Sequence, residues 1–571
     1  MTEEQRLFQE KKRDVVLKDF KELEDRIIGE PGTFREYMVA MRDGCRMRTV
    51  VCLPPGRERV PVILQRTPYP NSEMVFQAVA QEMTKRGFGY VYSFCRGTGG
   101  SEGDWYPNTM NERTDGKDTV DWLAEQSFTE SLGVWGNSYA ALTGWIMADL
   151  VEDKVQTMYL THYGLNRFSS MYSRGMFRQD VLTSWAMDNA GQPVTADFLE
   201  SAAYRPQIHV DEDKWGIRLD WYREWITHTD KTDSYWQQGF WHELQENGKK
   251  IRMPLFVGTS WFDHHFGSTM ETWKTLSPEC RAKSTLRIGA WSHFMLPCME
   301  HIETEHLELN DNKTAFLWFE SILMKKEKPE GRILSYQVGG DRWETSASYP
   351  FPKREEKSFY LSSEAADWPG ATRLTEKADS GERSLRYTYD PENPVETWGA
   401  EACLKSRESI GSLRQPSCGY REDVLSFVTE PLAEDLDILG VPEVEIWVSS
   451  DAEDTAFTAK LMEIYPDGES YNIRSGIATM AYPESDEEPR QTYVPQTKRR
   501  LRLHLWDTSW KLKAGSRLRV DISSSDFPQY SIHSNFAGNW AEQETCKTAE
   551  QTVFCGGDTP SRLVLPLKQG K

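Results

Sequence analysis

The first half of the chain alternates between short apolar runs and amphipathic helical segments. VPVILQRTPY from Val60, MPLFVGTSWFD from Met253 and TLRIGAWSH from Thr285 are apolar at most positions. Strands that are too continuously apolar to be half exposed are typical of a mostly parallel sheet covered by helices on both faces. The pattern therefore predicts one α/β domain built from residues 31–163 and 251–328, opened by a β-hairpin at Asp43-Gly44.

The alternation stops in three other regions. Residues 1–30 read as a charged helix, and residues 164–250 hold helically spaced segments such as LDWYREWI, which predict an inserted helical cap. Residues 329–571 hold many short β-like runs, among them ILSYQVGG, KSFYLSS and VPEVEIWVSS, separated by turn residues. That spacing predicts a C-terminal all-β jelly-roll domain.

Composition narrows the choice of partners and location. The net charge of −21 over 571 residues disfavours binding to nucleic acid or to an anionic membrane surface. The first residues are charged throughout and lack the apolar core of a signal peptide, so we expect a cytoplasmic protein with no membrane partner. The nine cysteines form no CxxC pair, which argues against a disulfide scaffold or a structural zinc site.

The stretch GVWGNSYAALTGWIMADL, from Gly133 to Leu150, is an apolar run that stops at Ser138 and continues as an Ala- and Leu-rich helix. A strand that breaks at Gly136, exposes a serine and turns at once into a helix has the layout of a nucleophile elbow. An ordinary strand-to-helix turn with a buried serine gives the same pattern. The choice between the two depends on whether a base and an acid lie near Ser138.

A serine hydroxyl becomes a nucleophile only beside a base, and that base needs a third group to orient it. In parallel sheets such groups gather at the carboxyl ends of the strands. Two later strands end in Asp263 and His293, and the chain order Ser, Asp, His is the α/β-hydrolase order. The alternatives are that Asp263 caps the following helix and that His293 is an ordinary core or surface histidine.

Several separated motifs resemble those of the cocaine esterase and X-Pro dipeptidyl-peptidase family of serine hydrolases, which also includes α-amino acid ester hydrolases and cephalosporin acylases. The resemblance spans about Thr33 to the C-terminus. The motifs are RTPY ending at Tyr69, RGTGGSEG from Arg96, DGKDTVDWL from Asp115, GNSY from Gly136, WFD ending at Asp263, WSH ending at His293 and SSSDFPQYSIHSN from Ser523.

The resemblance implies an α/β-hydrolase domain with a helical cap and a C-terminal jelly roll. It implies that Ser138 attacks an acyl carbon, His293 moves the proton and Asp263 orients His293. The family's oxyanion donors, a tyrosine hydroxyl and a backbone N–H, fall on Tyr69 and on the amide of Tyr139. No cofactor is implied.

Two positions depart from the family pattern. Ala141 stands three residues after the serine, where glycine is usual, and Phe94 stands two positions ahead of Arg96, where aspartate is frequent. Neither departure touches the predicted triad, but both leave room for altered activity.

For the acyl pocket we expect aromatic and polar side chains beside the motifs: Trp135, Trp261, Phe262, His265 and Phe294. Core packing explains each ring equally well. Adjacent histidines at 264 and 265 point apart on one helix or loop, and no third spaced ligand accompanies them, so no metal site is expected. They either shape the pocket or are exposed.

Three functions remain open from the residues. The first is an esterase acting on a small or aromatic acyl substrate, since His264 and His265 follow Asp263 where the α-amino ester branch has acidic residues. The second is an X-Pro dipeptidyl-peptidase that cleaves a short peptide. The third belongs to another class, a ligand-binding protein on a hydrolase scaffold without turnover. A homodimer formed through the jelly roll is also open.

Overall fold

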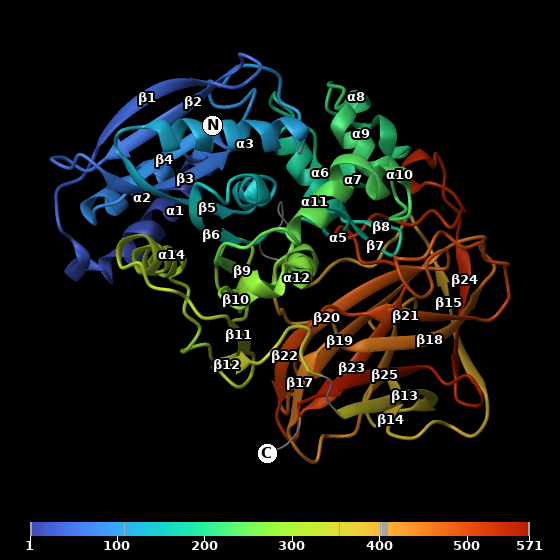
Figure 1. Cartoon of the computed structure of the whole chain (residues 1–571). Helices are drawn as coiled ribbons and strands as arrows, with labels where there is room; N and C mark the ends of the chain where they lie inside the picture. Colours follow the sequence, from blue (N-terminus) through green and yellow to red (C-terminus); the bar gives the residue numbers. More distant parts are fainter. Residues whose placement is uncertain (1–2, 108, 353–354, 400, 402–408, 569–571) are drawn as a thin grey trace.

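The computed structural model describes residues 3–107, 109–352, 355–399, 401 and 409–568. It contains a central mixed sheet, a group of short helices and a strand-rich C-terminal domain that lie against one another (Figure 1). Within this described part, no helix combines the length and the apolar composition that crossing a bilayer requires.

The central sheet has ten strands. Seven adjacent strands, from β4 to β11 in spatial order, run parallel to one another, as the continuous apolar runs predict. The predicted N-terminal hairpin adds two antiparallel strands at one edge. In spatial order the strands are β1 (Thr33–Ala40), β2 (Arg46–Leu53), β4 (Gly89–Phe94), β3 (Val60–Thr67), β5 (Thr129–Asn137), β6 (Val155–Thr161), β9 (Leu255–Phe262), β10 (Thr285–Ser292), β11 (Arg332–Gln337) and β12 (Arg342–Ser346).

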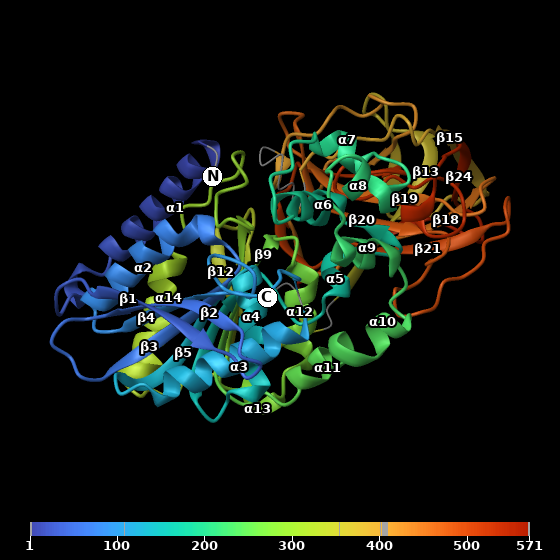
Figure 2. The same cartoon turned by 90° about the horizontal axis from the view of Figure 1, so that it is seen from above.

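Helices cover both faces of this sheet (Figure 2). On one face Phe20, Phe76 and Phe316 bring α1 (Glu3–Lys21), α2 (Glu73–Lys85) and α14 (Asp311–Phe319) into a common apolar core. The other face is covered by α3 (Met110–Glu125), α4 (Tyr139–Trp145) and α12 (Phe266–Thr275). The charged N-terminal segment is thus part of the α/β domain, because its apolar stripe completes one of the two cores.

Strand pairing crosses one of the predicted domain boundaries. The run ILSYQVGG was expected in the jelly roll, but it forms β11, which pairs in parallel with β10, and β12 pairs with β11. The connection from β10 through α14 to β11 is a further strand-helix-strand unit of the central sheet. A short apolar strand has the same pattern in either sheet, so the sequence could not assign it.

Residues 164–250 form the region between β6 and β9 as short helices and a two-stranded ribbon. We call this region the cap. Its elements are α5 (Phe168–Met171), β7 (Tyr172–Ser173), β8 (Met176–Phe177), α6 (Gln179–Asp188), α7 (Phe198–Ala202), α8 (Val210–Asp213), α9 (Asp220–Thr227), α10 (Ser234–Gln237) and α11 (Gly239–Gly248).

The C-terminal β domain is built mainly from antiparallel strands. Strand β18 buries every second side chain, as expected for a strand with one face on a core. The strands are β13 (Glu355–Ala365), β14 (Thr372–Thr375), β15 (Arg383–Tyr389), β16 (Leu425–Val428), β17 (Leu436–Gly440), β18 (Glu443–Ser450), β19 (Ala456–Ile464), β20 (Ser470–Thr479), β21 (Arg499–His504), β22 (Thr508–Leu512), β23 (Arg517–Ser523), β24 (Ala549–Cys555) and β25 (Arg562–Leu567).

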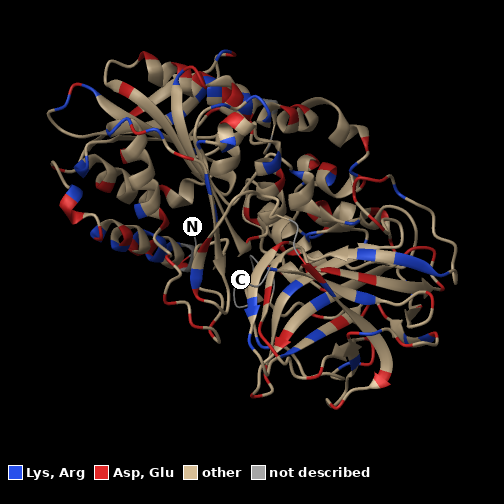
Figure 3. Ribbon diagram, turned by 60° about the horizontal axis from the view of Figure 1, so that its bottom comes forward, with Lys and Arg blue, Asp and Glu red and all other residues tan. Residues whose placement is uncertain are grey.

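Acidic and basic residues are interspersed along the ribbon of all three parts of the described chain (Figure 3). The excess negative charge is therefore spread rather than gathered on one part.

A buried arginine joins the β domain to the central sheet. Arg474 on β20 donates to the carbonyl oxygens of Trp261, at the end of β9, and of Asp507. Its Nη1 lies 3.3 Å from Oε1 of Glu401, which is itself buried. A buried charge of this kind is tolerated only when its hydrogen bonds and its counter-charge are supplied together.

We predict that Arg474→Met destabilises the protein by about 3–5 kcal/mol, because Glu401 is left buried without this partner. Thermal denaturation should show a midpoint lowered by about 5 °C or more. Arg414→Met is the matched control, since Arg414 pairs with Glu469 on the exposed surface of the same domain, and it should shift the midpoint by about 1 °C or less. Equal midpoints for the two variants would contradict the role given to Arg474.

Candidate active site

Three predicted site residues meet at the carboxyl edge of the central sheet. Ser138 directly follows β5, Asp263 follows β9 and His293 follows β10. Strand β6 lies between β5 and β9, and β9 pairs with β10. Parallel pairing thus brings together residues that are far apart in the sequence.

The backbone of Ser138 is held in an uncommon conformation, with φ of 58° and ψ of −131°. Its N–H donates to the carbonyl of Thr161 at 3.0 Å, and its own carbonyl accepts from the amide of Ala141 at 2.8 Å. Gly136 is required for this turn, since a Cβ there would lie 2.2 Å from the carbonyl oxygen of Ala140. The sequence GNSY therefore folds as a sharp strand-to-helix turn that presents the serine side chain.

The three side chains form one hydrogen-bonded series. Nε2 of His293 lies 2.9 Å from Oγ of Ser138, and Nδ1 of His293 lies 2.8 Å from Oδ1 of Asp263. Asp263 also accepts from the Thr259 hydroxyl at 3.1 Å and from the amide of His265 at 3.1 Å. In this arrangement the imidazole can take the serine proton while the carboxylate fixes its tautomer.

Asp263 is fully buried and still ionised. Burial alone would raise its pKa, but the neighbouring imidazoles of His162 and His293 and the hydrogen bond from His293 hold the pKa of Asp263 well below its usual range. The carboxylate therefore remains negative at any pH where the protein works, and it can offset positive charge that develops on His293.

His162, at the end of β6, was not singled out from the sequence. Its Nε2 accepts from Nε1 of Trp291 at 3.0 Å, and its Nδ1 lies 2.9 Å from the side-chain nitrogen of Asn137. Burial lowers the pKa of His162 to about 4, so the ring is neutral at pH 7. The rule that located Asp263 and His293, a polar residue at a parallel strand end, would also have located His162.

The predicted oxyanion side is built from Tyr69 and Tyr139. Tyr69 follows β3, and its hydroxyl accepts from Nε1 of Trp185 on α6 at 2.9 Å. Burial raises the pKa of Tyr69 well above its usual range, so the phenol stays protonated and keeps its own proton to donate. Tyr139 begins α4, and first-turn amides point their N–H groups away from the helix.

Cap tryptophans wall this side of the site. The rings of Trp185 and Tyr139 are stacked with centroids 5.8 Å apart, and Trp105 lies 5.8 Å from Tyr139. Trp185 also packs on Trp221 and Trp225 of α9, at 5.8 and 5.7 Å. The aromatic wall expected beside the serine therefore comes mainly from the cap.

Trp135 is not in the substrate pocket, and that prediction is wrong. Its ring packs on Tyr90, Tyr159 and Phe319 in the core formed with α1, α2 and α14. Trp261 is also committed elsewhere, because its Nε1 donates to the carbonyl of Tyr336 on β11 at 2.8 Å. Strand β9 is buried along its whole length and β5 is buried from Leu132 to Gly136, so no alternation told which face each ring occupies.

Of the remaining predicted pocket residues, Phe262 is buried at the end of β9. His265 lies 5.5 Å from the His293 ring and its Nδ1 contacts the Ser170 hydroxyl at 2.8 Å. Phe294 lies 5.6 Å from the His293 ring but also packs on Phe8 of α1, so the N-terminal helix reaches the loop that carries His293.

The expectation that His264 and His265 point apart is wrong. Their rings lie 4.2 Å apart, and His264 lies 4.0 Å from the ring of His293. Both are buried, which lowers their pKa values well below the usual range. Asp263, His264 and His293 come close enough to hold an ion, but both ring nitrogens of His293 already face Asp263 and Ser138, so ion binding would break that series.

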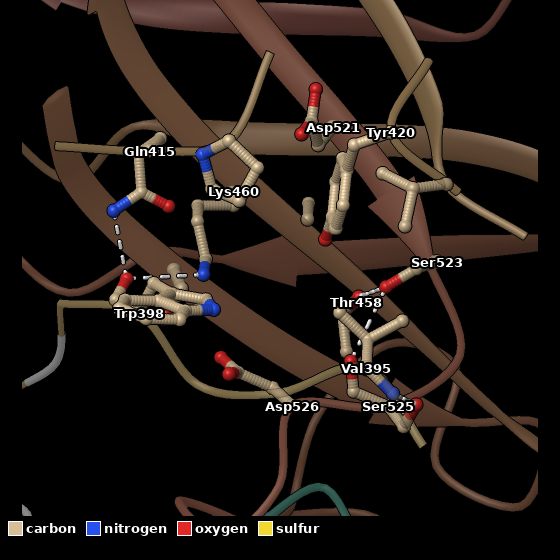
Figure 4. A pocket seen from close by; sticks show the side chains of 14 residues that line it. Val395, Trp398, Gln415, Tyr420, Thr458, Lys460, Asp521, Ser523, Ser525 and Asp526 are labelled. Atoms are coloured by element: carbon tan, nitrogen blue, oxygen red, sulfur yellow. Dashed lines mark hydrogen bonds between the residues drawn. The ribbon is translucent and has the colours of Figure 1, made fainter. Parts of the chain in front are cut away.

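A hollow in the β domain is the other feature to weigh as a binding site. It is lined by Trp398, Tyr420, Lys460 and Asp526, and Oδ1 of buried Asp526 has no hydrogen-bond partner (Figure 4). Its volume of about 20 Å³ is enough for a water molecule and too small for a substrate. Water at Asp526 is the simplest occupant.

Comparison with known proteins agrees with this architecture. Residues 43–295 match the X-Pro dipeptidyl-peptidase (S15 family) model, and residues 325–564 match the X-Pro dipeptidyl-peptidase C-terminal non-catalytic domain. Cocaine esterase from Rhodococcus sp. (strain MB1 Bresler) is 26% identical over 93% of this chain and 97% of its own.

Solved structures show the same fold. An aminopeptidase from a marine sediment Thaumarchaeota archaeon is 21% identical with a TM-score of 0.79, over 95% of this chain and 97% of its own. An α-amino acid ester hydrolase is also 21% identical with a TM-score of 0.79, over 94% and 97%. A CocE/NonD family hydrolase from Staphylococcus aureus is 16% identical with a TM-score of 0.65, over 94% of both chains.

These matches confirm the resemblance carried by the sequence motifs and the predicted fold class. They also identify the β domain as the non-catalytic part. The chain is therefore a hydrolase that belongs to the cocaine esterase and X-Pro dipeptidyl-peptidase family of serine hydrolases.

Proposed function

We propose that the protein cleaves a carboxylic ester through an acyl-enzyme, with Ser138 as nucleophile, His293 as general base and acid, and Asp263 as the group that orients His293. The observation that carries the proposal is the unbroken hydrogen-bonded series from Ser138 through His293 to Asp263. A serine in a strained turn, with an imidazole nitrogen 2.9 Å from its hydroxyl, is arranged for proton transfer on attack.

Each step follows from the positions of these groups. Oγ of Ser138 attacks the acyl carbon while its proton passes to Nε2 of His293, and the imidazolium then protonates the leaving alcohol. Water attacks the acyl-enzyme in the second half, with His293 again accepting a proton and returning it to Ser138. Asp263 stays ionised throughout and stabilises the imidazolium.

The negative charge that develops on the acyl oxygen needs donors that are already in place. The Tyr69 hydroxyl accepts from Trp185, so its own proton is left to point at that oxygen. The amide of Tyr139 supplies the second donor from the start of α4. Both donors are fixed before substrate binds, which is where their catalytic value lies.

An ester is favoured over an X-Pro dipeptide by the charges around the site. A dipeptidyl-peptidase must hold a free ammonium group, which needs a carboxylate facing the substrate. The side chains beside His293 are instead His264 and His265, and Arg167 lies behind His265. The X-Pro dipeptidyl-peptidase reaction remains the second candidate because it names the matching family model.

We expect Ser138→Ala to abolish hydrolysis of p-nitrophenyl butyrate, with a loss of about 10⁴-fold or more in kcat, because the nucleophile is gone. Wild type should cleave the ester efficiently and Gly-Pro-p-nitroanilide poorly. The side-by-side rates of both proteins on both substrates are the measurement, and a fluorophosphonate probe should label wild type only. Efficient cleavage of the anilide would instead support the dipeptidyl-peptidase, and no labelling with no cleavage would support a binding protein.

Tyr69→Phe should lower kcat by about 10²- to 10³-fold with a smaller change in KM, because one oxyanion donor is removed while the ring remains. Steady-state kinetics on p-nitrophenyl butyrate test this. Tyr106→Phe is a control, since it removes a phenol that bonds Glu224 on the cap surface, and its kcat should stay within about twofold of wild type. A Tyr69→Phe enzyme as fast as wild type would remove Tyr69 from the oxyanion site.

A further inference from the structure

Arg167, just before α5, is a buried cation that has no anionic partner among the described residues. It is 4% exposed, and its Nη1 donates to the neutral hydroxyl of Tyr163, while its Nε finds no hydrogen-bond partner in the part of the chain that the structure describes. Within the described part of the chain, no carboxylate oxygen lies within 4.0 Å of its guanidinium nitrogens. Burying a charge in this state is costly unless something supplies the missing anion.

The other buried arginines show how this chain normally meets that cost. Arg66 pairs with Glu112 at 3.2 Å, and Arg519 pairs with Asp521 at 2.7 Å. Arg174, whose guanidinium also has no carboxylate within 4.0 Å among the described residues, donates instead to the carbonyl oxygens of Tyr482 and Arg502. Arg167 has neither kind of compensation, which sets it apart.

One side of Arg167 faces the tryptophans that pack beside Tyr69. Its guanidinium carbon lies 4.5 Å from the ring centroid of Trp225, and the Trp225 ring lies 5.7 Å from that of Trp185. Trp185 in turn donates to the hydroxyl of Tyr69. Stacking on an indole holds the guanidinium in place but leaves its N–H edge available to an acceptor.

The other side of Arg167 faces His265, which lies beside His293. Tyr163, which accepts from Arg167, has its ring 3.9 Å from that of His265, and His265 lies 5.5 Å from the His293 ring. Burial has the largest effect on both neighbours, since it raises the pKa of Tyr69 and lowers the pKa of His265. The positive charge of Arg167 makes a smaller contribution that lowers both pKa values. Arg167 therefore lies between the tryptophans beside Tyr69 and the histidines beside His293, the two groups that flank Ser138.

We propose that Arg167 binds a carboxylate carried by the substrate, so that the natural substrate is an anionic ester. The proposal rests on the esterase function above and adds its substrate class. A carboxylate would supply the missing counter-charge and accept from the Nε and Nη edge in the bidentate geometry that guanidinium favours. A cationic substrate would be repelled by the same group.

The test compares esters that differ only in the anionic group. Mono-p-nitrophenyl glutarate carries the carboxylate in its acyl part, 3-(butyryloxy)benzoate carries it on the leaving group, and p-nitrophenyl butyrate and phenyl butyrate are their neutral counterparts. Wild type should prefer one anionic ester over its neutral counterpart, and the preferred ester tells which side of the scissile bond faces Arg167.

In Arg167→Met the ratio of kcat/KM for the preferred anionic ester to that for its neutral counterpart should fall by about 10- to 100-fold, mostly through KM, because a charge-assisted bond is lost. Arg167→Lys keeps the charge and should recover part of the ratio. Arg218→Met is the matched control, since it removes an exposed cap arginine and should leave the ratio unchanged.

The outcomes separate this inference from the function on which it rests. Serine-dependent cleavage of neutral esters without preference for either anionic ester would overturn the role of Arg167 and leave the esterase intact. If no ester is cleaved, calorimetry of glutarate binding to wild type and to Arg167→Met still tests whether Arg167 binds a carboxylate. Binding lost in the variant supports the anion site, and equal or absent binding overturns it.

Discussion

The backbone of Ser138 is the constraint around which the site is arranged. For a non-glycine residue, a backbone conformation with φ of 58° and ψ of −131° costs about 1–3 kcal/mol, which the surrounding structure must offset. Here β5 is held between β3 and β6, the amide of Ser138 is bonded to Thr161, and α4 is buried along its whole length. Ala141, fully buried in α4, is accommodated where the family usually has glycine. The methyl group evidently fits because the tight contact in this turn falls at Gly136 instead.

Three groups near Ser138, namely Asp263, His162 and Tyr69, each keep a single protonation state at pH 7. Asp263 is ionised because its hydrogen bonds and neighbouring imidazoles outweigh burial, His162 is neutral because burial dominates, and Tyr69 keeps its proton for the same reason. A site with one carboxylate, neutral accessory histidines and a protonated phenol can accept a proton at His293 and donate one at Tyr69 without competing titrations. The low dielectric that fixes these states also strengthens every hydrogen bond in the series.

The sequence was informative wherever function depends on the end of a strand. Asp263 and His293 could be predicted because parallel strands end at one edge, whatever their order in the sheet. The pattern failed where orientation mattered: β5 is buried at every position from Leu132 to Gly136, so nothing in it told that Trp135 faces the α1 side. It failed also where partners are long-range, since β11 is assigned by its pairing with β10. An unpaired Arg167 is invisible in sequence, because pairing is a property of the folded chain.

The non-catalytic β domain contributes to the site through the cap. The amide of Ser531 donates to the carbonyl of Phe177 at 2.8 Å, immediately before α6, and Arg178 stacks near the rings of Trp506 and Tyr530. Helix α6 carries Trp185, whose indole N–H donates to the Tyr69 hydroxyl, so the phenol proton is left for the proposed oxyanion position. The position of Trp185 beside Tyr69 thus depends in part on contacts made by loops of the β domain. Since a shift of about 1 Å at a donor is enough to weaken a preorganised site, the proposed catalysis depends on all three parts of the chain.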